Sequence, residues 1–219
     1  MIDFKLIQDS WPLLARGANV TIQIAALGTL IGIVLGTILA LMQTSKSALT
    51  RWPVNLYVTI IRGIPMLIQI TFAFYVLPQF GIQLPAFWVA VVAIGLNSAA
   101  YVSQIIRTGI KSIGKGQVEA GRVLGLSNMD ITRNIILPQA FRLVIPALGN
   151  EFITLVKDSS LASVIGVVEL TKEGNFIRAR TFDAFTVFAA VAFTYLIITT
   201  TLSLFINWLE QRMNRHVKN

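Results

Sequence analysis

The chain has 219 residues, of which 55% are hydrophobic and only 13% are charged, and its formal net charge is +8. Because soluble domains carry about 25% charged residues, this composition excludes a water-soluble protein and indicates a polytopic helical membrane protein. The basic excess does not call for a nucleic-acid partner, since the cytoplasmic loops of membrane proteins collect Lys and Arg.

Five apolar segments follow one another along the chain, and a helix needs about 20 apolar residues to cross a bilayer. The second segment is interrupted by Arg62-Gly63-Ile64-Pro65, and the fourth is short and contains Glu151. A further apolar stretch, 161–168, is too short to cross alone and suits a re-entrant or internally packed piece. We therefore predict an all-α fold with about five transmembrane helices in a single domain, residues 1–219. The segments are about 19–43, 54–77, 86–106, 143–156 and 185–208.

Basic residues are distributed unevenly between the connections of these five segments. The side that receives both the connection after the third segment and the C-terminal tail is rich in Lys and Arg, whereas the other side mixes basic and acidic residues. The positive-inside rule then places the N-terminus outside and the C-terminus in the cytoplasm. The basic positions on the predicted cytoplasmic side are Lys46, Arg51, Arg107, Lys111, Lys115, Arg122, Arg133, Arg142, Arg212, Arg215 and Lys218.

The connection 107–142 is too long for a simple turn, and its first half reads as a short helix over 118–124. Gly125 is well placed to end this helix, because glycine readily adopts the left-handed conformation found at helix C-termini. The connection therefore begins as a helix that stops at a defined point.

The second half of the connection reads as another short helix. Ser127, with Asp130 three residues later, matches a capping box at its start. We expect Pro138 to end it, because the residue before a proline avoids helical geometry. The two helices would form a hairpin that projects from the membrane. The apolar residues of the second helix are Ile131, Ile135 and Ile136.

The residues of this hairpin resemble the EAA loop of bacterial ATP-binding-cassette (ABC) importer permeases. Gly121 departs from the usual pattern, which has alanine there, but it keeps a small side chain. Further residues are similar to the polar amino-acid uptake permeases, a family that includes the histidine, glutamine and arginine systems: 17–21, 62–65, Ala100-Tyr101 with Arg107, and 157–161. The EAA positions are Glu119, Ala120, Gly121, Gly125, Ile135, Leu137 and Pro138.

The resemblance implies a type I ABC importer permease in the bacterial inner membrane. It further implies a second permease subunit, either a copy or a paralogue, an external amino-acid-binding protein, and a cytoplasmic ABC ATPase dimer that binds ATP and Mg. The loop would dock in a groove on the ATPase. Gln104 and Thr108 depart from the family, in which glutamate and glycine are common at these positions.

Ionisable and polar residues inside apolar segments are expensive and usually functional. Glu151 and Asp158 are seven residues apart, so a continuous helix places them on nearly one face. Asn97, Tyr101 and Gln104 also share a face, with Thr108 following. These two polar stripes indicate a pathway through the protein.

A zwitterionic amino acid needs an acceptor for its ammonium group and donors for its carboxylate. Glu151 or Asp158 would serve the ammonium group, and Asn97 with backbone amides near Ser160 would serve the carboxylate if a helix starts there. Two carboxylates favour arginine, lysine or histidine. Alternatively, Asp158 holds a helix end or an inter-subunit contact, and residues 62–65 are interpreted as a shaped break in a helix rather than a ligand. The candidate substrate-binding residues are Asn97, Tyr101, Glu151, Asp158 and Ser160.

Several catalytic patterns are missing from the sequence. It has no cysteine, one histidine (His216) and no glycine-rich loop followed by lysine that would cradle a phosphate. We therefore expect no catalytic site, no metal and no cofactor in this chain, with ATP hydrolysis on the partner. Three alternatives stay open: an ABC permease for an opine or quaternary amine, an ion-driven secondary transporter, and a membrane scaffold.

Overall fold

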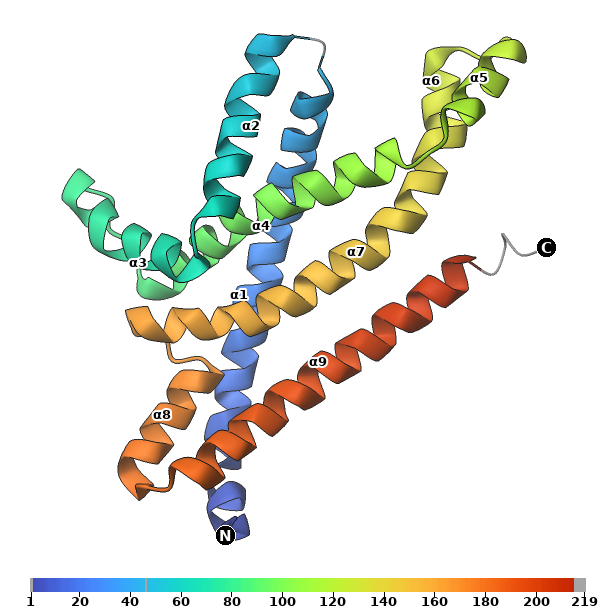
Figure 1. Cartoon of the computed structure of the whole chain (residues 1–219). Helices are drawn as coiled ribbons and strands as arrows, with labels where there is room; N and C mark the ends of the chain where they lie inside the picture. Colours follow the sequence, from blue (N-terminus) through green and yellow to red (C-terminus); the bar gives the residue numbers. More distant parts are fainter. Residues whose placement is uncertain (1, 46, 215–219) are drawn as a thin grey trace.

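The computed structural model describes residues 2–45 and 47–214, and within them every regular element is helical, which confirms the all-α fold (Figure 1). Lys46, Arg215, His216 and Lys218 lie outside the described residues. The elements are α1 (Phe4–Thr44), α2 (Ala48–Gly63), α3 (Met66–Val76), η1 (Leu77–Phe80), α4 (Ala86–Lys111), α5 (Lys115–Val123), α6 (Asn128–Asp130), the π-helical η2 (Ile131–Ile136), α7 (Leu137–Asp158), η3 (Ser159–Ile165), α8 (Leu170–Thr181) and α9 (Ala184–Asn214).

Three described helices, α1, α4 and α9, are each long and apolar enough to cross a membrane. The pair α2 and α3 meets the same standard together, although it bends by 103° at the break. The fourth predicted segment, 143–156, belongs to α7, which is 22 residues long but is not among the helices apolar enough to count as a span. The structure therefore has a broken second segment and a more polar fourth one than a bundle of five plain spans.

Helix α1 begins 15 residues earlier than the predicted first segment, at Phe4 rather than near residue 19. The side chain of Asp3 accepts a hydrogen bond from the Leu6 amide at 3.0 Å and caps the helix. Hydropathy marks where a helix is apolar and says little about its polar ends, which explains the difference.

Helices α1 and α4 pack very closely because glycine residues line their contact. Gly28, Gly32 and Gly36 recur every fourth residue of α1 and are all buried. A Cβ atom at Gly32 would lie 2.5 Å from Ser98 Oγ, so the contact has no room for a methyl group. This is the small-residue packing by which membrane helices approach each other.

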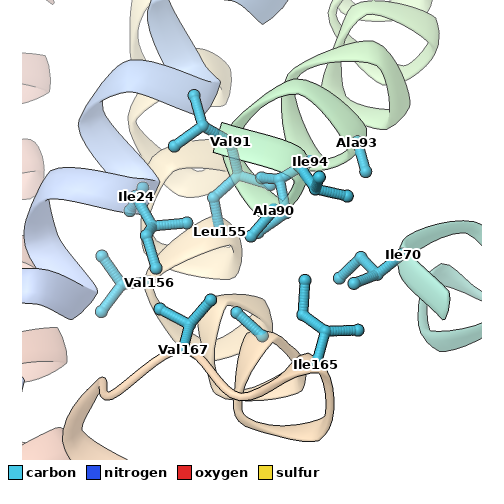
Figure 2. Close-up of a cluster of buried hydrophobic side chains, with 13 residues drawn as sticks. Ile24, Ile70, Ala90, Val91, Ala93, Ile94, Leu155, Val156, Ile165 and Val167 are labelled. Atoms are coloured by element: carbon cyan, nitrogen blue, oxygen red, sulfur yellow. The ribbon is translucent and has the colours of Figure 1, made fainter. Parts of the chain in front are cut away.

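A buried apolar cluster joins five elements at the centre of the fold (Figure 2). Ile24 of α1 and Ile94 of α4 meet Leu155 of α7, while Ile70 of α3 and Ile165 of η3 close the cluster from the other side. The cluster fixes the C-terminal half of α7 against α4. The stretch 161–168 packs within the protein, because η3 and its flank contribute several buried residues.

Helix α8 is held to its neighbours through Glu169, which is fully buried. Its carboxylate accepts hydrogen bonds from the backbone amides of Thr171 and Lys172, at 2.9 and 2.8 Å, and from the hydroxyl of Tyr195 at 2.9 Å. The first two bonds cap α8. The third ties the start of α8 to α9.

Candidate functional site

The break between α2 and α3 shapes one wall of the candidate site. Gln69 spans it, because its Nε2 donates to the carbonyl oxygens of Ile61, at 2.7 Å, and Ile64, at 2.8 Å. These carbonyls would otherwise lack partners, since the chain turns away at Pro65 and the helical ladder stops. The 103° bend between α2 and α3 confirms the predicted break at 62–65.

A cavity of about 400 Å³ lies between this break, α4 and α7. Four of the five candidate substrate-binding residues line it, and they come from two helices that are distant in sequence. Ser160 is not among the lining residues and belongs to η3, past the end of α7. The lining residues are Arg62, Gly63, Ile64, Pro65, Met66, Asn97, Tyr101, Glu151, Thr154, Leu155 and Asp158.

The two cavity carboxylates differ in their hydrogen bonds. Ser98 Oγ donates to Glu151 Oε1 at 3.0 Å. Within the described residues, the Asp158 carboxylate accepts no hydrogen bond. Glu151 is thus anchored to α4, while Asp158 keeps its acceptor capacity free. Both side chains reach the same cavity, so the prediction that Glu151 and Asp158 share one face of α7 is confirmed.

The donors expected for a substrate carboxylate already have partners within the protein, although the Asn97 amide keeps a second N–H. Asn97 Nδ2 donates to Gln69 Oε1 at 3.1 Å. The amide of Ser159 donates to the Leu155 carbonyl, because the chain passes from α7 directly into η3 without a break. The 3-10 helix η3 does begin at Ser159, but it follows α7 without a gap, so the Ser159 amide is not the free donor expected of an isolated helix start.

Arg62 also lines the cavity, and the sequence reasoning assigned it no binding role. Its guanidinium lies over the ring of Tyr101, 5.1 Å from the centroid, as a cation–π contact. The motif 62–65 was interpreted through its backbone alone. The available signal was a cation inside an apolar segment, a residue type that is functional by default.

A second cavity of about 480 Å³ shares Arg62 and Tyr101 with the first and continues along α4 past Gln104 and Thr108. The predicted polar stripe of α4 therefore lines two cavities that share Arg62 and Tyr101. Gln104 Nε2 donates to Gln43 Oε1 at 3.0 Å, which links α4 to α1.

The helical hairpin is present, and its turn has the expected glycine. Gly125 has φ +76° and follows α5, with its amide bonded to the Arg122 carbonyl and the Leu126 amide bonded to the Gly121 carbonyl. This is a Schellman motif. Ser127 caps the next helix, since its Oγ accepts from the Asp130 amide at 3.1 Å, so both predicted ends are confirmed.

The second helix of the hairpin does not end at Pro138, contrary to the prediction. Leu137 has helical angles, φ −58° and ψ −47°, and the six-residue π-helix η2 runs without interruption into α7. The wider π turn accommodates the proline ring. Pro138 has no backbone N–H, but it lies in the first turn of α7, where proline is tolerated. The hairpin and the helix that carries both cavity carboxylates are thus one continuous rod.

The EAA residues divide into a buried contact and an exposed surface. Gly121 is buried, and a Cβ there would lie 2.9 Å from Ile131 Cγ1 and 3.1 Å from Ile135 Cδ1. This close approach explains why glycine replaces the usual alanine. Glu119, Ala120, Gly125, Leu137 and Pro138 are exposed. Beside them, Val123 is 88% exposed and Met129 74% exposed, so the tip presents apolar side chains.

Comparisons with known proteins cover nearly the whole chain. The family model for "binding-protein-dependent transport system inner membrane component" matches residues 32–215. An L-cystine transport system permease protein of Bacillus subtilis (strain 168) is 44% identical over 218 residues, 99% of this chain and 93% of that protein. A glutamine transport system permease protein of Escherichia coli (strain K12) is 40% identical over 213 residues, 96% and 97% of the two. A crystal structure of an amino acid ABC transporter with histidines gives a TM-score of 0.92 at 37% identity, covering 97% of this chain and 99% of that one.

Proposed function

The chain belongs to the family of binding-protein-dependent transport system inner membrane components, and on that premise we propose that it moves polar amino acids into the cytoplasm as the permease subunit of an ABC importer. Dependence on a binding protein favours this function over an ion-driven secondary transporter and over a scaffold. Relatives that transport cystine and glutamine support amino acids as the substrate class.

The observation that carries the proposal is the cavity that Glu151 and Asp158 line together. Carboxylates inside a membrane bundle are retained for a ligand or a pathway. An ammonium group would form charge-assisted hydrogen bonds with the free oxygens of Asp158. Two carboxylates also favour a side chain with a second positive group, so we infer a preference for cationic amino acids.

The proposed partners follow from the exposed hairpin and from the family. The apolar tip, with Val123 and Met129, would insert into a groove on the ABC ATPase, which binds ATP and Mg. A second permease, identical or paralogous, would complete the pathway, and an external binding protein would deliver the substrate. This requires the hairpin and the C-terminus in the cytoplasm and the N-terminus outside, as the basic residues predict. ATPase closure would then exchange the outward-open for the inward-open arrangement.

The test is ATP-driven uptake of labelled L-arginine by vesicles that contain the assembled importer and its binding protein, with unlabelled amino acids as competitors. We expect uptake to require ATP and to survive an ionophore. Competition by lysine, ornithine or histidine alone supports a cationic preference, whereas competition by glutamine or cystine assigns a broader polar substrate class. Competition only by an opine or a quaternary amine would overturn the amino-acid assignment.

The site itself is tested with Asp158→Asn and Glu151→Gln, which remove charge at nearly constant shape. Each should weaken uptake about tenfold or more, because a hydrogen bond to a charged group contributes about 1.5–3 kcal/mol. Asp9→Asn is the matched control, since Asp9 is exposed near the start of α1 and does not line the cavity. Unchanged affinity and selectivity in Asp158→Asn would contradict the site.

A further inference from the structure

We propose, building on the function above, that Arg62 binds the α-carboxylate of the amino acid in the 400 Å³ cavity, so that the permease itself selects intact amino acids over amines that lack a carboxylate. Arg62 is in the last turn of α2, directly before the 103° bend. The bend turns the end of α2 toward α4, and Arg62 lines the cavity together with Glu151 and Asp158.

The other side-chain donors that line the cavity are largely committed elsewhere. The amide of Asn97 donates to Gln69, and the hydroxyl of Thr154 donates to the Asn150 carbonyl at 3.1 Å. Tyr101 holds the guanidinium of Arg62 over its ring, and its hydroxyl offers one uncharged donor. Arg62 is thus the donor with the greatest unused capacity among the lining residues, because a guanidinium has five N–H groups.

The charges of the cavity are arranged for a ligand with two opposite charges. Glu151 and Asp158 both project from α7, whereas Arg62 projects from α2, and in the described parts of the chain no carboxylate forms a salt bridge with Arg62. Each of these charges can gain charge-assisted hydrogen bonds from a ligand group of opposite charge. A zwitterion supplies both partners at once, with its ammonium group toward α7 and its carboxylate toward Arg62.

The chemistry of arginine fits this role better than that of any other cation. Its planar fork binds a carboxylate through two parallel hydrogen bonds. The Tyr101 ring supports the guanidinium from one face and leaves its edge, which carries the N–H groups, free for the ligand. Lysine would keep the charge but lose the two-point contact.

The experiment measures equilibrium binding to the full permease with its ATPase in lipid nanodiscs, without the binding protein, so that only the permease selects. The probes are two pairs that differ by a carboxylate: L-arginine with agmatine, and L-cystine with cystamine. We expect the unaltered protein to bind the amino acid of at least one pair about tenfold more tightly than its amine. Arg62→Gln should weaken amino-acid binding roughly tenfold to hundredfold while the amine changes less than about threefold, so that selectivity disappears.

Two variants make the outcome decisive. Arg178→Gln removes a positive charge from an exposed position of α8 and should change the affinity for neither the amino acid nor the amine. If Arg62→Gln weakens binding of both the amino acid and its amine, Arg62→Lys decides. Weaker binding of the amino acid alone supports the proposal, whereas equal weakening of both, or no weakening, overturns it. Equal affinity of the unaltered protein for amino acid and amine also overturns it. Failure of the unaltered protein to bind any of the four probes would instead overturn the proposed substrate site, which separates the two failures.

Discussion

Replacing Gly32 by alanine should damage the substrate site from outside it. A Cβ at this position would lie 2.5 Å from Ser98 Oγ and 2.8 Å from Ser98 Cβ, across the contact of α1 with α4. Ser98 is fully buried and donates to Glu151 at 3.0 Å. Because normal carbon contacts are about 3.5–4.0 Å, the helices must separate by about 1 Å or Ser98 must turn. Either response strains the Ser98–Glu151 hydrogen bond.

The expected free energies follow from three effects. Overpacking a tight contact costs about 1–3 kcal/mol, and loss of a hydrogen bond to a carboxylate costs about 1.5–3 kcal/mol. In the opposite direction, the higher helix propensity of alanine over glycine stabilises the folded state by about 1 kcal/mol. We therefore expect Gly32→Ala to lower the free energy of unfolding by about 1.5–5 kcal/mol and to weaken amino-acid binding severalfold.

The assay combines thermal unfolding of the purified complex with equilibrium binding of the transported amino acid. Gly116→Ala in α5 is the matched control, since no atom lies within 4 Å of a Cβ there, and it should be neutral or slightly stabilising. Ser98→Ala alone should weaken binding by a similar factor, and the double variant should be less than additive because both changes act on one hydrogen bond. A Gly32→Ala protein with unaltered stability and affinity would refute the reasoning.

Three further changes test other parts of the fold. Gly125→Ala should destabilise the hairpin by about 1 kcal/mol, because its φ is +76°, and should reduce substrate-stimulated ATPase activity more than substrate binding; Gly125→Asn should partly restore it. Gln69→Met should leave the carbonyls at the break unpaired and free Asn97, which lowers the melting temperature by several degrees and alters substrate affinity. Glu169→Gln should destabilise the protein by more than Tyr195→Phe, since it affects both amide bonds of the α8 cap as well as the tyrosine bond, as thermal unfolding would measure.

The residues that sequence reasoning located correctly are those with a local chemical signature. Gly125 and Ser127 were identified because helix ends need a left-handed residue and a capping oxygen, which are properties of a few neighbouring positions. Glu151 and Asp158 were placed together because a helix brings residues seven apart to one face. Each inference needed only the geometry of a single helix.

The errors arose where the surrounding structure, rather than the local sequence pattern, decides the outcome. Pro138 was expected to end a helix, but the π turn before it absorbs the proline within a longer helix. Asn97 was proposed as a donor to the substrate without its partner Gln69, a residue of another helix that accepts a hydrogen bond from its amide. Arg62 was missed because the break at 62–65 was predicted without its direction, and the 103° bend is what brings Arg62 to the cavity. Contacts between helices therefore determine which polar groups stay available.

The unbroken run from η2 into α7 also has a mechanical meaning. Six residues of π-helix and 22 of α-helix give a rod of roughly 40 Å at about 1.5 Å per residue, with the hairpin at one end and Asp158 at the other. The rod works as a lever arm: a tilt of about 5° at one tip displaces the opposite tip by roughly 3–4 Å over that length. No loop interrupts the helix between the hairpin and the carboxylates, although Pro146 lies inside α7. The stiffness of the helix around Pro146 therefore determines how much of a push on the hairpin becomes a displacement of the carboxylates.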